Sequence, residues 1–157
     1  FNKWEQEAKT VAAGNERGEE LNQLKYPHGI FVDKNKSIHM ADAGNNRIIK
    51  WKYNATEGEI IAGGNGQGNR TNQLNFPTSM IVDSEKNSLI IFNISNERVI
   101  QWRNQNGQEI LFENIWCQGL AMDKYEYIYV SNCRNNDVRR WKFGEKGEGT
   151  LIAAWKW

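Results

Sequence analysis

The chain of 157 residues has little of several residue types that often decide a protein's class. It contains two cysteines, which carry little information by count, and two histidines, which have no partners in the pattern of a Ser-His-Asp or Cys-His site. No apolar run approaches the roughly 18 residues of a transmembrane helix, so we expect no membrane span. The net charge of +1, from 20 basic and 19 acidic residues, gives no strong field toward nucleic acid or a membrane.

What the sequence does contain is a motif that occurs three times and ends each time on tryptophan. The copies occupy residues 29–51, 79–102 and 119–141, so they start 50 and then 40 residues apart. The difference falls in the polar, glycine-rich segment 63–73, which we interpret as a flexible inserted loop. A weaker match precedes the first copy: Trp4 is followed by residues 11–14 and 23–27, which match residues 61–64 and 73–77.

Each copy predicts four short strands rather than helices. In the first copy the apolar runs are 29–33, 38–42, 47–53 and 59–62, and Gly, Asn, Asp and Ser residues separate them. Four strands in about 40 to 50 residues are typical of a β-propeller blade. The first run of each copy is almost continuously apolar, which indicates that neighbouring blades cover both of its faces. We therefore expect an all-β chain made of the second half of a leading blade (1–27) and blades at 28–77, 78–117 and 118–157.

The pattern Pro-x-Gly-Ile-x-Val-Asp, followed by Ile-x-x-Ala-Asp-x-x-Asn-x-Arg-Ile, resembles NHL-repeat β-propellers. The resemblance extends from Trp4 to about Ala154, and Ser79, Asn93 and Asp137 depart from the pattern. It implies a six-bladed ring, of which this chain would be a fragment of about three and a half blades. The alternative is a half-propeller that a second copy completes.

Two features, the glycosylation sequons and the placement of the two cysteines, indicate an extracellular or secretory protein. Four Asn-x-Ser/Thr sequons begin at Asn35, Asn54, Asn69 and Asn93, all in expected turns, loops or strand ends. A chain rich in Asn, Ser and Thr also produces such sequons by chance.

The two cysteines lie where a hairpin would bring them together. If the hairpin turns at Tyr125, paired residue numbers sum to 250, and Cys117 and Cys133 satisfy that sum. Directly paired residues have Cβ atoms about 4.5–5.5 Å apart, near disulfide range. We therefore predict a bridge between them; two independent buried thiols are the alternative.

The candidate site lies at the start of the first strand of each blade, where propellers collect ligand groups around the central channel. His28, Thr78 and Gln118 occupy this position. The segment from Pro27 to Asp33 also resembles blades of peptidyl-amidating lyases, which hold zinc through histidines there. One histidine in three positions does not make a zinc site, so we predict no metal and no cofactor. His39 is expected to serve packing.

Residues that recur in every copy are expected to hold the blade together. Asp and Asn residues at strand ends accept backbone N–H groups in Asx-turns, and a tryptophan at a fixed strand position suits packing between blades. This interpretation covers three sets: Asp33, Asp83 and Asp123; Asp42, Asn93 and Asn132; and Asn45, Asn96 and Asn135.

We therefore expect a non-catalytic binding scaffold for a protein, peptide or glycan, with the remaining blades or a second copy as a further partner. The expected binding residues are those that escape the repeat: His28, Asn46, Thr78, Gln118 and Arg134. The alternative is part of a propeller enzyme, amidating-lyase-like or a hydrolase, whose catalytic residues lie on other blades. RNA binding, known for some NHL propellers, is a minor alternative because the arginines are scattered and balanced by acids.

Overall fold

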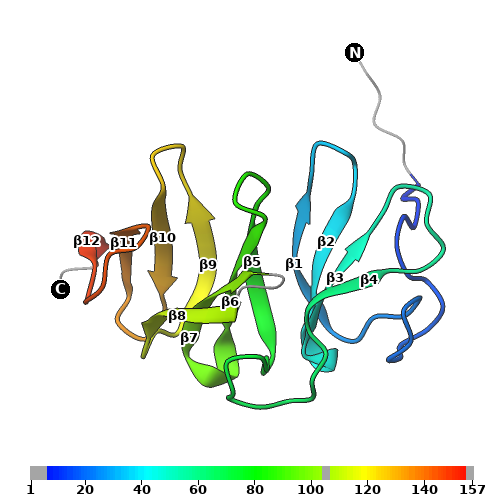
Figure 1. Ribbon diagram of the computed structural model, residues 1–157, viewed down its shortest axis with the longest axis horizontal. Coiled ribbons are helices and arrows are strands. Elements are labelled where there is room, and N and C mark those ends of the chain that lie inside the picture. Colours follow the sequence, from blue (N-terminus) through cyan, green and yellow to red (C-terminus); the bar gives the residue numbers. More distant parts are fainter. Residues whose placement is uncertain (1–6, 104–106, 155–157) are drawn as a thin grey trace.

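The computed structural model describes residues 7–103 and 107–154, and of residues 117 and 118 only the backbone. It is all-β, with three four-stranded antiparallel sheets that each follow chain order (Figure 1). The first sheet contains β1 (Pro27–Val32), β2 (Ile38–Asp42), β3 (Arg47–Trp51) and β4 (Glu59–Gly63). The second contains β5 (Pro77–Asp83), β6 (Ser88–Asn93), β7 (Arg98–Arg103) and β8 (Gly107–Glu113). The third contains β9 (Cys117–Met122), β10 (Tyr127–Asn132), β11 (Asp137–Lys142) and β12 (Thr150–Ala154).

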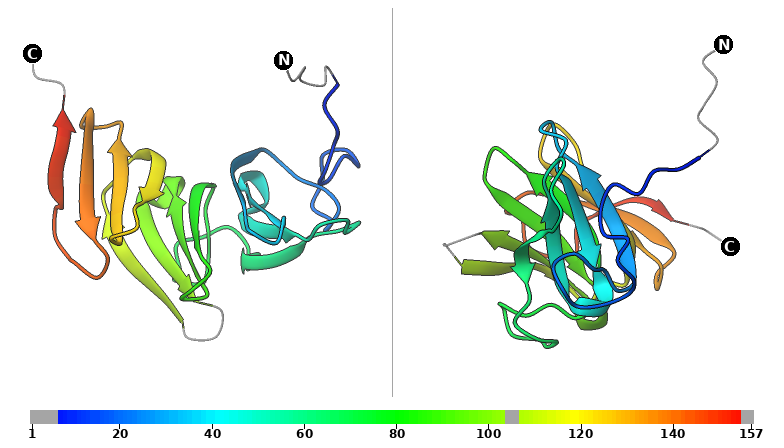
Figure 2. Two further views of the ribbon diagram at one scale, coloured as in Figure 1. Left: turned by 90° about the horizontal axis from the view of Figure 1, so that it is seen from above. Right: turned by 90° about the vertical axis from the view of Figure 1, so that its right-hand side faces the viewer.

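The three sheets stand side by side as blades in an open row (Figure 2). Their first strands are neighbours, since β1 contacts β5 and β5 contacts β9. The β1–β2, β5–β6 and β9–β10 turns all lie at one end of the molecule, the top of Figure 1. Two short 3-10 turns, η1 (Ala43–Asn45) and η2 (Ile94–Asn96), join the second and third strands of the first two blades. No helix among the described residues has the length and hydropathy needed to cross a membrane.

Two apolar layers hold the blades together. Ile48, Leu74 and Ile91 are fully buried between blades one and two, and Phe92, Val99 and Val130 are fully buried between blades two and three. The repeated tryptophans have the packing role expected of them: Trp51, Trp102 and Trp141 are 3%, 7% and 3% exposed. Trp4 lies outside the described residues.

The outer face of the first blade is only partly covered. Ala12, Ala13 and Leu24 of the leading segment pack against Met40, Ile49 and Trp51. On β1, however, Ile30 and Val32 remain 66% and 58% exposed. The prediction that both faces of this strand are covered is therefore wrong for the first blade of the described chain, because no further sheet stands beside it there.

Long loops lead into the first and second blades. The leading loop (residues 14–26) and the second loop (residues 64–76) have the same internal bonds. An Asn side chain donates to a carbonyl seven residues on, at 3.3 Å and 3.0 Å, and a Gln side chain donates to the backbone carbonyl of that Asn. The arginine that begins the third strand of the next blade, Arg47 or Arg98, donates to three carbonyl oxygens of each loop. The second loop is thus a hydrogen-bonded unit, contrary to the flexible connection that its glycines suggested.

The predicted disulfide is not present. The register sum of 250 holds from Ile128↔Met122 to Ser131↔Gly119, but an irregularity then places Asn132 opposite Cys117. Cys133 is an exposed free cysteine, and its backbone N–H donates to the Trp116 carbonyl at 2.8 Å. The Cys117 side chain lies outside the described residues.

The structure also bears on one candidate glycosylation site. The Asn93 side chain is fully buried, and its Oδ1 accepts the Asn75 N–H at 2.7 Å, so an oligosaccharyl group cannot reach it in the folded chain. Asn35, Asn54 and Asn69 are exposed.

Candidate functional site

Two of the expected binding residues line one cavity between the first strands of neighbouring blades. This cavity, the axial pocket, measures about 470 Å³ and is lined by His28, Gly29, Thr78, Ser79 and Ile94. Gly29 permits the two strands to approach closely, because a Cβ at that position would lie 2.7 Å from the Thr78 carbonyl oxygen. The equivalence of the first strands in the sequence therefore does bring His28 and Thr78 together.

The axial pocket has unused hydrogen-bonding capacity. The Thr78 hydroxyl is buried and has no partner among the described residues. His28 is exposed, and its ring meets Phe76 edge-on with centroids 5.3 Å apart. A buried hydroxyl without a partner carries a free-energy cost. The pocket is thus lined by an exposed imidazole and by a threonine whose hydroxyl has no partner among the described residues.

The other expected binding residues make bonds within the fold or are not described. Asn46 has a left-handed backbone (φ 54°), and its Oδ1 accepts the Phe76 N–H at 2.9 Å, which links blade one to the second loop. Arg134 forms a two-point ion pair with Glu97, at 2.7 Å and 3.0 Å, which links blades two and three. The Gln118 side chain lies outside the described residues.

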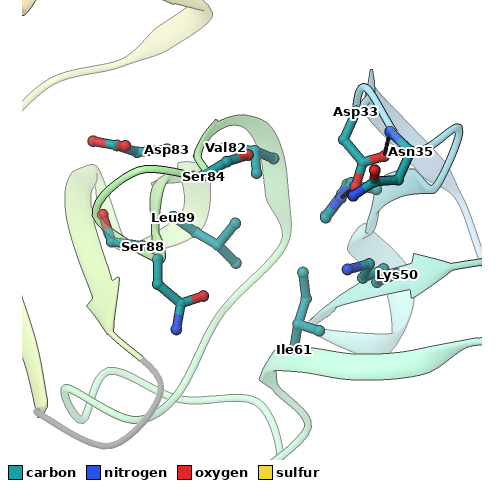
Figure 3. Close-up of a pocket in the computed structure, with 11 residues that line it drawn as sticks. Asp33, Asn35, Lys50, Ile61, Val82, Asp83, Ser84, Ser88 and Leu89 are labelled. Atoms are coloured by element: carbon teal, nitrogen blue, oxygen red, sulfur yellow. Dashed lines mark hydrogen bonds and ion pairs between the residues drawn. The ribbon is translucent and has the colours of Figure 1, made fainter.

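A second cavity opens between the first two blades at their turn end (Figure 3). It measures about 250 Å³; Asp33, Asn35 and Lys50 lie on one wall, and Val82, Asp83 and Leu89 lie on the other. His39, on the first wall, is 4% exposed, and its Nε2 lies 3.1 Å from Asp33 Oδ2. This pair was not expected from the sequence, in which His39 was assigned to packing alone.

An Asp–His pair in a cleft suggests acid–base chemistry, but the third blade shows what the pair does. There Asp123 accepts a hydrogen bond from the Tyr129 hydroxyl at 3.0 Å, six residues away as in Asp33–His39. Both pairs fasten the second strand of their blade to the preceding turn. Asp33 and His39 are therefore a clamp of the blade hairpin.

The carboxylates of these clamps are held ionised by their turns. Burial by itself would raise the pKa of Asp33, but hydrogen bonds from His39 and the backbone N–H groups of Ser37 and Asn35 outweigh it and lower the pKa. The pKa of Asp123 is lowered chiefly by the Tyr127 N–H, with further help from Tyr125 and Tyr129. These bonds, with those that Asp83 accepts from Glu85 and Lys86, confirm the Asx-turn prediction for the first set of aspartates. It is wrong for Asp42 and Asn93, which accept the N–H groups of Lys25 and Asn75 from the preceding loops.

Among the described residues, no three His, Cys, Asp or Glu side chains are grouped so as to hold a metal ion. His28 is the sole histidine lining the axial pocket as described.

No protein-family model matches the sequence, and no curated protein matches it either. Solved structures do resemble it. A chain of a nidogen/laminin complex matches 74% of this chain with a TM-score of 0.59 and 14% identity. A protein of unknown function from Bacteroides thetaiotaomicron matches 92% with a TM-score of 0.62 and 15% identity, and a streptogramin B lyase matches 82% with a TM-score of 0.58 and 18% identity.

These similarities establish the fold. Three antiparallel four-stranded sheets that resemble the blades of β-propeller-like structures confirm the predicted fold class. The chain spans 43%, 37% and 40% of the respective matched chains. At identities of 14–18%, the similarity does not extend to activity.

Proposed function

We propose that this chain is a non-catalytic segment of a propeller that binds a protein or peptide partner through the axial pocket. The observation that carries the proposal is the buried, unpartnered hydroxyl of Thr78 beside the exposed ring of His28 in one cavity. A binding surface needs hydrogen-bonding groups that the fold itself does not use, and these two residues supply them.

The contrast with the repeated polar residues supports the same proposal. Asp33, Asp42 and Asp123 each accept several hydrogen bonds from their own blade or its loop. These carboxylates therefore serve to hold the structure together. The nidogen/laminin complex adds that a protein of this fold occurs in a protein–protein complex.

Selection from a displayed peptide library on the native chain tests this function. We expect enriched peptides to bind about fivefold to tenfold more weakly to Thr78→Val, which removes one hydrogen bond without changing the side-chain shape. His28→Ala should weaken the same peptides. Thr56→Val, at an exposed threonine in the β3–β4 connection, is the matched control and should bind normally. Peptides that bind all variants equally would refute the axial pocket as the site, and enrichment of glycans alone in a parallel array would refute a peptide partner.

We also propose an NHL-type ring of six blades and a secretory origin, supported by the repeat motif and by the exposed sequons at Asn35, Asn54 and Asn69. Mass spectrometry of the protein from its native source tests the second point. Unmodified asparagine at all three positions would contradict it.

A further inference from the structure

The third blade lacks the loop that the first two blades bind. Residues 114–116 alone connect β8 to β9, whereas the second loop spans residues 64–76 between β4 and β5. The arginine that would anchor such a loop is also missing: Asp137 stands where Arg47 and Arg98 begin the third strand of the other blades. The short connection and the missing arginine are thus one structural change.

The space that a loop would occupy remains open as a groove. It measures about 310 Å³ and is lined by the connection at Glu113–Ile115, by Asn135, Arg139 and Trp141, and by Glu148 at its rim. We call it the loop groove. It lies between blades two and three and is separate from the axial pocket, with which it shares no lining residue.

Donors that bind a loop in the other blades are present here without one. In blades one and two the repeated asparagine donates its side-chain amide to a glycine carbonyl, Asn45 to Gly18 and Asn96 to Gly68, both at 2.8 Å. The equivalent Asn135 is exposed, and its side-chain amide makes no hydrogen bond with the described residues.

A guanidinium is present as well. Arg139 lies two residues after Asp137, the position that an arginine occupies in the other blades. Its Nε donates to Asp137 Oδ2 at 2.9 Å. The same two atom types join Arg47 Nε to Asp42 Oδ2 at 2.7 Å, there between paired residues of neighbouring strands. Arg139 Nη1 donates to the Glu148 carbonyl, and Nη2 makes no hydrogen bond within the described residues.

We propose that the loop groove binds a loop of a partner protein that presents backbone carbonyl oxygens to Asn135 and Arg139. The two loops of this chain show what such a groove accepts, because their carbonyl oxygens meet the same two donor types. Glu148 already pairs with Arg139 at 3.8 Å, so Glu113 is the lining carboxylate that favours a ligand loop with a basic residue, and the second loop carries one in Arg70.

The test titrates a synthetic peptide with the sequence of residues 64–76 into the isotope-labelled native chain and follows NMR signals. We expect saturable shifts of the Asn135 side-chain amide and the Trp141 indole, and none with a scrambled peptide of the same composition. Asn135→Ala should weaken binding about fivefold, the effect of one neutral hydrogen bond. This asparagine is exposed and its side chain unbonded in the described structure, so its removal leaves folding intact.

Asn35→Ala is the matched control, because Asn35 is also exposed and lies outside the groove. Thr78→Val should bind the peptide normally, which separates this inference from the axial pocket. Absence of saturable binding, shifts confined to other surfaces, or equal affinity in Asn135→Ala would overturn the proposal.

Discussion

Replacing Asn93 with aspartate is expected to stabilise the chain, because blade two contains an incomplete version of a buried hydrogen-bond cluster seen in blade one. In blade one, Asp42 accepts the Lys25 N–H at 2.7 Å on Oδ1. Its Oδ2 accepts Asn45 Nδ2 at 2.8 Å and Arg47 Nε at 2.7 Å. The carboxylate thus joins the loop, the turn and the guanidinium.

In blade two a carboxamide takes its place. Asn93 Oδ1 still accepts the Asn75 N–H, but Asn93 Nδ2 and Arg98 Nε are both buried without partners among the described residues. Both groups are donors, so they cannot bond to each other. Burial also lowers the pKa of the Arg98 guanidinium, and only the charge of Glu113 counters it.

The size of the effect follows from these two unpaired donors. Each unpaired donor costs about 1–3 kcal/mol. A carboxylate at position 93 has no amide N–H to leave unpaired, and it accepts a hydrogen bond from Arg98 Nε. Burying the new charge costs several kcal/mol, which its attraction to the already buried Arg98 offsets. The net gain is about 1–2 kcal/mol, which raises the melting temperature by about 2–8 °C.

The assay is thermal unfolding at pH 7 of Asn93→Asp and the native chain, both produced without N-glycosylation. Asp42→Asn is the mirror variant and should lose about 3 kcal/mol, because it breaks a buried pair with Arg47. A lower melting temperature in Asn93→Asp, or no change in Asp42→Asn, would refute the reasoning.

Three other predictions concern the loop anchors and the clamps. Arg47→Lys should destabilise the chain by about 2–3 kcal/mol in denaturant unfolding, because an ammonium cannot reach three carbonyl oxygens and Asp42 together; an unchanged midpoint would contradict the anchor role. Asp33 and Asp123 have lowered pKa values, so their contribution to stability is complete above the unfolded pKa of about 4 and is lost as pH falls through the lower folded pKa. The melting temperature of Asp33→Asn should therefore depend less steeply on pH in acid than that of the native chain. Parallel curves for the two proteins would contradict this prediction. Tyr129→Phe should lower the free energy of unfolding by loss of its bond to Asp123, measured by chemical unfolding, and a neutral result would exclude the clamp.

The repeat predicted the fold well because its signals are local. Strands, Asx-turns and buried tryptophans each depend on residues within one blade, and the spacing of Asp33 and Trp51 is enough to place them. The axial pairing of His28 and Thr78 also followed, since equivalent first strands must be neighbours in a row of blades.

What the sequence did not show depends on contacts between distant segments. Arg47 bonds to carbonyls 24 to 28 residues earlier, and no local pattern indicates that role. The irregularity at Asn132 shifts the register by one residue and separates the two cysteines, although the pairing sum had joined them. The 40-residue spacing and the unusual Asp137 were both visible, but only the structure connects them as the loss of one loop.

The recurring polar residues hold the blades, with Asn135 of the third blade as the exception, whereas we propose that Thr78 and His28, which escape the repeat, bind a partner. Thr78→Val tests this proposal most directly, measured in the same preparation for thermal stability and for affinity to a library-selected peptide. We expect an equal or higher melting temperature, because an unpaired buried hydroxyl is removed, together with about fivefold or greater loss of affinity. A lower melting temperature with unchanged affinity would contradict the proposal.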